Sequence, residues 1–113
     1  MKINQYEIWL ADLNPRNGTE SGKIRPVLII QTNLLNEANH PSTIICPLTT
    51  IVQPKAEILR VHIPKGIANT EKDCDIMIDQ IRAIDNTRLI KKIGVLPNKL
   101  AQKVKENLKI ILE

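Results

Sequence analysis

Residues 27–30, Val-Leu-Ile-Ile, constrain the fold of this 113-residue chain more than any other segment, because they form a continuous apolar run rich in β-branched side chains. A run this short and this apolar, preceded by Arg25-Pro26 and followed by Gln31, predicts a strand that is buried on both faces. Such a strand must be covered on each side by other parts of the chain. Pro26 suits the first residue of the strand, where a missing backbone donor is tolerated.

Four more strands are predicted from β-forming side chains bounded by turn residues, at residues 6–13, 43–48, 57–63 and 75–85. Pro47 indicates that the second of these lies at a sheet edge or contains a bulge. Residues 75–85 are apolar in both phases of a strand, so we expect this long strand to bend.

Residues 57–63 alternate in polarity, which is typical of a half-exposed strand. The side chains expected to point inward are Leu59, Val61 and Ile63, and those expected to point outward are Arg60 and His62.

Loops and helices fill the rest of the pattern. Residues 14–24 contain Pro15 and two glycines and predict a loop, and residues 32–42 predict a polar connection with a helical turn at 33–38. Residues 97–112 predict a helix with Pro97 in its first turn. Its apolar face is expected to consist of Leu100, Val104, Leu108, Ile111 and Leu112.

Five strands followed by a terminal helix predict one mainly β (β plus α) domain over residues 1–113, a small SH3-like antiparallel β-barrel with a C-terminal helix. The core must be aliphatic, because the chain has no Phe, one Trp and one Tyr. A chain this short buries a modest share of its surface, so an oligomer would help to cover apolar area.

Charge and cysteine usage narrow the functional classes. Sixteen Lys and Arg against twelve Asp and Glu give a formal charge of +4, which suits a polyanionic partner without proving one. The first residues, Met-Lys-Ile-Asn-Gln-Tyr-Glu, break up any apolar run, so we expect no signal peptide and no membrane span. Cys46 and Cys74 are expected to be reduced thiols of a cytoplasmic protein, and the scattered Cys and His residues predict neither a metal site nor a cofactor.

Familiar catalytic motifs are missing, but a polar cluster is expected at strand ends. Neither serine lies in a nucleophile elbow, and the glycines match no phosphate-binding fingerprint. The loop 18–22 (Gly-Thr-Glu-Ser-Gly) leads to Arg25, and Thr49-Thr50 end the predicted strand 43–48. A simple alternative is that Arg25 caps a strand edge and pairs with Glu20.

Five segments resemble the MazF/PemK family of mRNA interferase toxins. They are residues 11–15 (Ala-Asp-Leu-Asn-Pro), 18–20 (Gly-Thr-Glu), 25–31 (Arg-Pro-Val-Leu-Ile-Ile-Gln), 46–50 (Cys-Pro-Leu-Thr-Thr) and 79–85 (Asp-Gln-Ile-Arg-Ala-Ile-Asp). Each motif alone is weak, but their order and separation match the family along nearly the whole chain.

The resemblance implies an SH3-like barrel, a homodimer and metal-independent cleavage of single-stranded RNA. It implies products with a 2′,3′-cyclic phosphate and a 5′-hydroxyl, inhibition of translation, and neutralisation by a cognate antitoxin, for which we expect an acidic disordered tail. It assigns catalytic roles to Arg25, Thr49 and Glu20. The RNA-binding residues expected with them are Thr19, Ser21, Thr50 and Gln80. Ser21 stands where the family often has Gln, so its side chain is shorter than the one that the family usually presents.

Such cleavage requires a deprotonated 2′-hydroxyl, a stabilised pentavalent phosphorane and a protonated leaving oxygen. Arg25 offers a planar fork of donors for the phosphorane, and Thr49 could add one hydrogen bond. Because the ordinary pKa of Arg lies far above neutral pH, an electrostatic role is expected for Arg25 before a proton-transfer role.

Two other functions remain open at this stage. A non-catalytic CcdB-like gyrase poison would share the barrel and act through the end of its C-terminal helix, but residues 110–113 offer no aromatic anchor. A basic RNA-binding module without turnover would bind RNA with the same salt dependence, so only product formation separates it from a ribonuclease.

Overall fold

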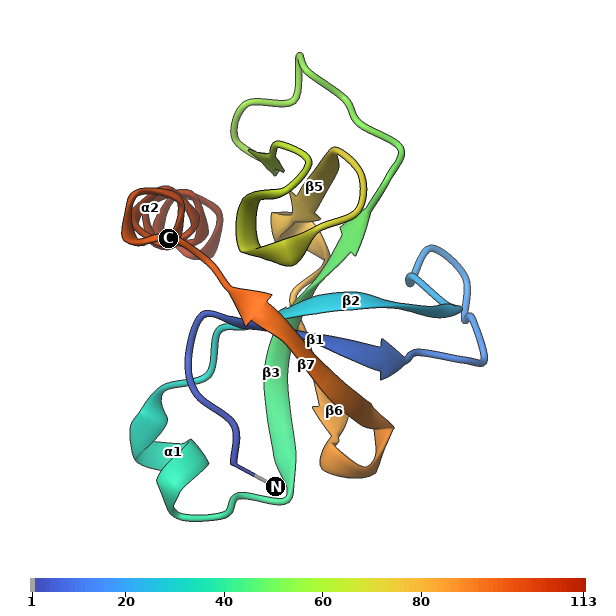
Figure 1. Cartoon of the computed structure of the whole chain (residues 1–113), viewed down its shortest axis with the longest axis vertical. Helices are drawn as coiled ribbons and strands as arrows, with labels where there is room; N and C mark the ends of the chain where they lie inside the picture. Colours follow the sequence, from blue (N-terminus) through green and yellow to red (C-terminus); the bar gives the residue numbers. More distant parts are fainter. Residues whose placement is uncertain (1) are drawn as a thin grey trace.

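The computed structural model describes residues 2–113, which fold into a curled antiparallel sheet with two α-helices (Figure 1). The strands are β1 (Glu7–Asp12), β2 (Ile24–Ile29), β3 (Ser42–Thr49), β4 (Arg60–Ile63), β5 (Cys74–Met77), β6 (Arg82–Asp85) and β7 (Leu89–Val95). The helices are α1 (Asn33–Glu37) and α2 (Asn98–Leu112), and the short 3₁₀ turns are η1 (Ile67–Asn69), η2 (Ile78–Gln80) and η3 (Asn86–Arg88).

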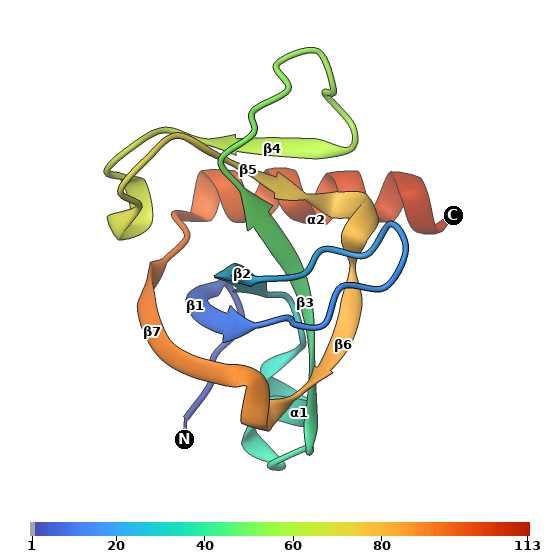
Figure 2. The ribbon, with the colours of Figure 1, turned by 90° about the vertical axis from the view of Figure 1, so that its right-hand side faces the viewer.

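The sheet has the order β4-β5-β3-β2-β1-β7, and β6 pairs with β3 beside this path. The mainly β architecture with a C-terminal helix is therefore confirmed, although the barrel is left open between its two outer strands, β4 and β7. Figure 2 shows α2 lying between the β4–β5 pair and the β1–β2 hairpin, where it covers the inner side of the curl. None of the helices in the described part of the chain is both long and apolar enough to span a membrane.

The central strand is β3, so the prediction that Pro47 marks a sheet edge is wrong. One side of β3 pairs with β2, and the other pairs first with β6 over residues 42–45 and then with β5 over residues 48–49. Pro47 lies in the gap between these two partners, where its missing N–H interrupts no ladder on that side. The predicted strand 75–85 is divided by η2 into β5 and β6, because each half pairs with a different end of β3.

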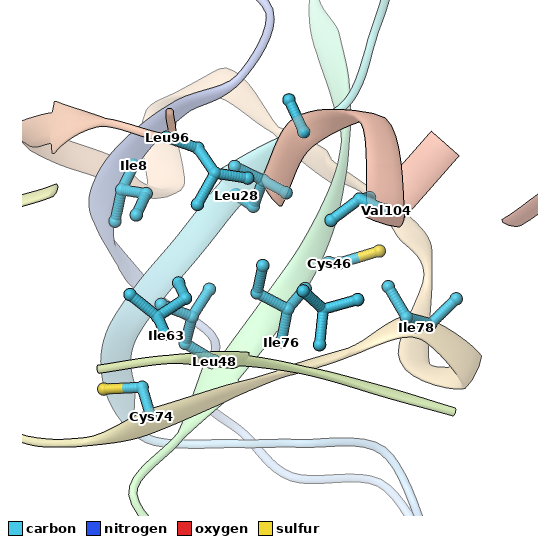
Figure 3. Close-up of a cluster of buried hydrophobic side chains, with 12 residues drawn as sticks. Ile8, Leu28, Cys46, Leu48, Ile63, Cys74, Ile76, Ile78, Leu96 and Val104 are labelled. Carbon is cyan, nitrogen blue, oxygen red and sulfur yellow. The ribbon is translucent and has the colours of Figure 1, made fainter. Parts of the chain in front are cut away.

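Residues 27–29 are completely buried from both faces, as the apolar run predicts. Leu28 belongs to one hydrophobic cluster, while Val27 and Ile29 belong to a second cluster on the opposite face. Figure 3 shows the first cluster, in which Leu28 lies near Val104 of α2. The second cluster includes Trp9, whose indole Nε1 donates to Glu7 Oε1 at 3.0 Å. This tryptophan is therefore a core residue rather than a surface platform.

Several boundaries differ from the sequence predictions. Strand β4 begins at Arg60, so Leu59 precedes it and is 42% exposed rather than inward, while Val61 and Ile63 are buried as expected. Strand β2 begins at Ile24, two residues before Pro26, but its pairing with β3 begins only at Val27.

The predicted apolar face of α2 is confirmed for four of its five residues, since Val104 is in the core and Leu100, Leu108 and Ile111 pack against it. Leu112 is 67% exposed, and the fully buried positions include Ala101 and Asn107 beside Val104. Burial of Asn107 is tolerated because its side-chain amide donates to the Glu57 carbonyl oxygen at 3.2 Å. Helical spacing alone does not reveal this polar partner. Strand β7 formed no part of the sequence prediction.

Candidate functional site

A hollow of about 260 Å³ lies where β2 begins and β3 ends. We call it the Arg25 hollow. Its lining includes Lys23, Ile24, Arg25, Thr49, Thr50 and Ile51. Three of the residues singled out from the sequence, Arg25, Thr49 and Thr50, are thus brought together.

The strand register explains why Arg25 and Thr49 meet. Pairing of β2 with β3 joins Ile29 to Ile45 and Val27 to Pro47, so the same register continued by two residues places Arg25 opposite Thr49. Both side chains lie on the face of Val27, because side chains two residues apart in a strand share a face. The two residues are far apart in sequence, and the β2–β3 hairpin alone makes them neighbours.

The row continues across the next two strands. Thr49 pairs with Asp75 of β5, and Asp75 pairs with His62 of β4. Directly opposed residues project from the same face of an antiparallel pair. Arg25, Thr49, Asp75 and His62 therefore form one line across β2, β3, β5 and β4, which we call the cross-strand row.

Arg25 is half-buried and is held by backbone carbonyls. Its Nε donates to Gly22 O at 2.9 Å and its Nη1 donates to Leu48 O at 3.3 Å. No carboxylate within residues 2–113 lies within ion-pair distance of this guanidinium. Burial lowers the pKa of Arg25 below its ordinary value, and the positive charge of Arg16 lowers it further. The group is a fixed cation whose remaining N–H donors can serve an anionic ligand.

Thr49 presents a hydroxyl donor to the same hollow. Its Oγ1 accepts a hydrogen bond from Ile51 N at 3.2 Å, which leaves the hydroxyl hydrogen available to a ligand. Thr50 is exposed at the end of β3. Thr49 is therefore the better fixed of the two adjacent threonines.

Glu20 does not pair with Arg25. Its Oε2 lies 3.6 Å from Arg82 Nη1, at the start of β6, and Arg82 Nη1 also approaches Ser21 O at 3.5 Å. The simple alternative, in which Arg25 caps a strand edge by pairing with Glu20, is thus not what the structure contains. Arg82 instead fastens the loop 18–22 to the sheet.

The other predicted RNA-binding residues lie outside the lining of the hollow. Thr19 is exposed on the loop, and Ser21 Oγ donates to Met77 Sδ at 3.9 Å. Gln80 is half-buried in η2. None of these three residues lines the Arg25 hollow.

Sequence reasoning missed the group around Asp75. His62 was expected only to point outward from its strand and Asp75 was not singled out, yet the Asp75 side chain is only 2% exposed. The carboxylate accepts from Gln53 N at 2.8 Å, from Arg60 Nη1 at 3.4 Å and from His62 Nδ1 at 3.1 Å. The available signal was a single acidic residue, Asp75, in an otherwise apolar strand. Burying a carboxylate costs folding free energy unless hydrogen-bond or ion-pair partners compensate for it.

A larger groove of about 600 Å³ adjoins the Arg25 hollow, and the two share Pro26, Thr50 and Cys74. Three lysines line it, Lys72, Lys91 and Lys92, together with apolar side chains that include Leu10 and Ile93. We call it the lysine groove. Burial raises the pKa of the Cys74 thiol, as do the neighbouring charges of Asp73 and Asp75, so this cysteine is a packing residue rather than a reactive thiolate.

Comparison with known proteins gives a consistent result. The family described as PemK-like, MazF-like toxin of type II toxin–antitoxin system matches residues 4–112. Endoribonuclease EndoA of Bacillus subtilis is 36% identical over 112 residues, covering 99% of this chain and 96% of the relative. Endoribonuclease MazF of Staphylococcus saprophyticus is 35% identical over 110 residues, covering 97% of this chain and 91% of the relative.

Solved structures of lower identity share the fold. MazF from Deinococcus radiodurans superposes with a TM-score of 0.82 at 19% identity, covering 99% of this chain and 97% of the other. A MazE–MazF complex from the same organism gives 0.77 at 19% identity, with coverage of 99% and 96%.

Proposed function

The chain belongs to the PemK-like, MazF-like toxin family of type II toxin–antitoxin systems, and from that premise we propose that it is an endoribonuclease whose Arg25 hollow cleaves single-stranded RNA. The observation that carries this proposal is the position of the Arg25 guanidinium. It has no acidic partner among the described residues, is anchored by two carbonyls and lies opposite a free threonine hydroxyl. An RNA phosphate is the ligand that best matches such a fork of donors.

The proposed reaction is an internal transesterification. The 2′-oxygen of one nucleotide loses its proton and bonds to the adjacent phosphorus, and the bond from phosphorus to the 5′-oxygen of the next nucleotide breaks. That 5′-oxygen takes up a proton, so the products carry a 2′,3′-cyclic phosphate and a 5′-hydroxyl. Arg25 and Thr49 stabilise the extra charge on the non-bridging oxygens of the phosphorane.

No metal ion is needed in this proposal, because Arg25 supplies the positive charge that a divalent ion would otherwise bring. The lowered pKa of Arg25 would make it easier for this residue to give up a proton. An arginine nevertheless remains a cation at neutral pH, so the proposed role of Arg25 is electrostatic. We also propose a catalytic role for Glu20, the carboxylate of the loop 18–22, which Arg82 holds in position.

RNA contacts outside the hollow are proposed for Thr19, Ser21, Thr50 and Gln80. Thr19 and Thr50 are exposed on the two connections that follow β1 and β3. The lysine groove continues from the hollow past Pro26. Lys72 and Lys91 suit the phosphates of a strand that extends beyond the cleaved bond, whereas Lys92 is paired with Glu7.

A homodimer and an antitoxin partner are also proposed. Ile24 and Ile51 are 55% and 72% exposed beside the Arg25 hollow. Neighbouring exposed apolar side chains are typical of a protein–protein interface. A second copy that covers them would place the interface beside the site. One of the solved structures that share the fold is a MazE–MazF complex. An antitoxin with an acidic disordered tail would complement the basic hollow and block the RNA cleavage that inhibits translation.

The function is tested by incubating the purified protein with a long single-stranded RNA in EDTA and mapping the new ends chemically. We expect discrete cuts with cyclic phosphate and 5′-hydroxyl ends. Cleavage that stops in EDTA and returns with a divalent ion would refute the metal-free mechanism. RNA that is bound but never cut would favour the RNA-binding module, and inhibition of gyrase without RNA cleavage would favour the CcdB-like alternative.

The assembly is tested separately by sedimentation. We expect a dimer at tens of micromolar protein and protection of the Arg25 hollow from RNA when antitoxin is bound. A monomer under those conditions contradicts the homodimer. An antitoxin that neutralises the toxin while RNA still enters the hollow contradicts the proposed antitoxin site.

A further inference from the structure

We propose that His62 is a stacking platform for an RNA base close to the cleaved bond, with its ring held in place by Asp75. This inference rests on the proposed function and extends the site from the Arg25 hollow along the cross-strand row to β4. The ligand is a nucleobase of the single-stranded RNA that the hollow binds.

The His62 ring has a fixed orientation. Its Nδ1 lies 3.1 Å from Asp75 Oδ1, and because a carboxylate only accepts hydrogen bonds, Nδ1 is the donor. Asp75 is itself immobilised, since its second oxygen accepts from Gln53 N and from Arg60 Nη1. The bond therefore directs the ring towards β5, the strand that separates His62 from Thr49.

The same group fixes the chain that follows Thr49. Arg60 Nη1 donates to Ile51 O at 3.1 Å as well as to Asp75, and the Gln53 amide is bound to the same carboxylate. The start of the β3–β4 connection is thus tied to β4 and β5. A ligand in the Arg25 hollow and a ligand on His62 would meet one rigid surface.

The spacing suits neighbouring nucleotides. Adjacent strands are about 4.8 Å apart, so two strand spacings put His62 on the order of 10 Å from Thr49. Both residues lie on the same face as Arg25. Asp75 lies between them but is only 2% exposed and is bonded to Arg60, so an RNA strand crossing the row would not meet a bare carboxylate.

His62 is the ring that this face offers to a base. Trp9 is buried in the second cluster, and Tyr6 is half-buried against the first. His40 bonds Ser42 at the far end of β3, seven residues from Thr49 and therefore about 23 Å along the strand. The His62 side chain is 46% exposed, so ring surface is available, and RNA-binding proteins use histidine as well as larger rings for stacking.

The test uses binding rather than cleavage. The probe is a single-stranded RNA that contains one mapped cut site and carries 2′-deoxyribose at the nucleotide whose 2′-oxygen attacks. Its dissociation constant is measured by fluorescence anisotropy for the wild type and for His62→Leu, with an abasic nucleotide placed at each position near the cut site in turn. We expect His62→Leu to weaken binding about tenfold or more, the usual effect of losing one stacked base.

The position dependence identifies the contact. One abasic position should weaken binding to the wild type and have little further effect on His62→Leu, because the base and the ring then lose the same interaction. His62→Phe should restore binding, since it keeps a ring. His62→Gln should bind as weakly as His62→Leu, because it can retain a donor to Asp75 but has no ring. His40→Leu is the matched control and should bind like the wild type.

The inference is overturned if His62→Leu binds like the wild type, if every abasic position affects both proteins equally, or if His62→Lys restores binding where His62→Phe does not. The last result would show a phosphate contact instead of stacking. These outcomes leave the proposed function standing as long as Arg25 variants lose cleavage. Thermal melting of each variant confirms that it is folded.

Discussion

Glu20 forms its ion pair with Arg82, with 3.6 Å between Glu20 Oε2 and Arg82 Nη1, although Arg25 lies only five residues further along the chain. This pairing leaves Arg25 without an acidic partner in the described part of the chain and fastens the loop 18–22 to β6. An arginine that is anchored by carbonyls and faces a hollow is organised to receive an anion.

Replacing Arg25 with Lys or Ala should lower the initial cleavage rate at saturating RNA about a hundredfold or more, the usual effect of losing a transition-state donor. Lys keeps a positive charge but not the planar fork that can bond carbonyls and phosphate oxygens together. Both variants should fold and dimerise, since the two carbonyl bonds that they lose are partly exposed to water.

Lys23→Asn is the matched control for Arg25, because it removes another positive charge from the hollow while Asn tolerates the positive φ of 68° at this position. It should change the rate less than Arg25→Lys does and mainly at low salt, where the lost charge is least screened. Near-native rates for Arg25→Lys would mean that another residue stabilises the phosphorane.

Thr49→Ala should reduce the cleavage rate less than Arg25→Ala does, and Thr50→Ala less again. Thr49 is expected to supply one neutral hydrogen bond, whereas Arg25 supplies charge-assisted ones. Thr49→Ser should restore most of the rate because it keeps the hydroxyl. If Thr50→Ala is the more damaging change, the functional hydroxyl belongs to the exposed threonine instead.

Acid should destabilise the fold through Glu7. Burial raises the pKa of this carboxyl, but hydrogen bonds from Lys92, Trp9 and Asn4 outweigh it and leave the pKa below the ordinary 4.5. A lowered pKa in the folded state contributes stability that is present above about pH 4.5 and is lost as the pH falls through the folded-state pKa. Urea unfolding at a series of pH values should show this loss.

Glu7→Gln is the comparison variant for the acid experiment. At neutral pH it should be less stable than the wild type by about 1–3 kcal/mol, because it loses charge-assisted hydrogen bonds. Its stability should then fall less steeply on acidification. Parallel pH profiles for the two proteins would show that Glu7 is not responsible.

Gly94 should not tolerate a side chain. A Cβ at this position in β7 would collide with the carbonyl group of Ala68, 2.8 Å from its carbon atom. Gly94→Ala should therefore cost about 1–3 kcal/mol and lower the melting temperature by several degrees. Gly18→Ala meets no atom within 4 Å and is strained only by its φ of +56°, so it should cost about 1 kcal/mol. Equal stabilities for both variants would contradict the close packing of β7 on η1.

Local patterns predicted the elements whose signal is contained within one segment. The apolar run at residues 27–30 gave a strand buried on both faces, and the helical spacing after Pro97 gave α2. Where burial depends on what covers a segment, the prediction was wrong. Leu59 and Leu112 are apolar and exposed, while Asn107 is polar and buried against Glu57 O.

The candidate site divides in the same way. Arg25 and Thr49 could be named from their motifs, and the family resemblance could be read from the order of those motifs. Asp75 and His62 could not, because an acidic residue beside apolar ones in a strand has the same local pattern whether it faces water or a buried partner. The sequence by itself determined most of the strand-forming segments, although not β7, and which chemical groups the chain carries. Only the tertiary structure decided that Arg25, Thr49, Asp75 and His62 lie in one line across four strands. The register between strands depends on pairing across long sequence distances, and that pairing sets which side chains share a face and which cationic side chains bind the Asp75 carboxylate.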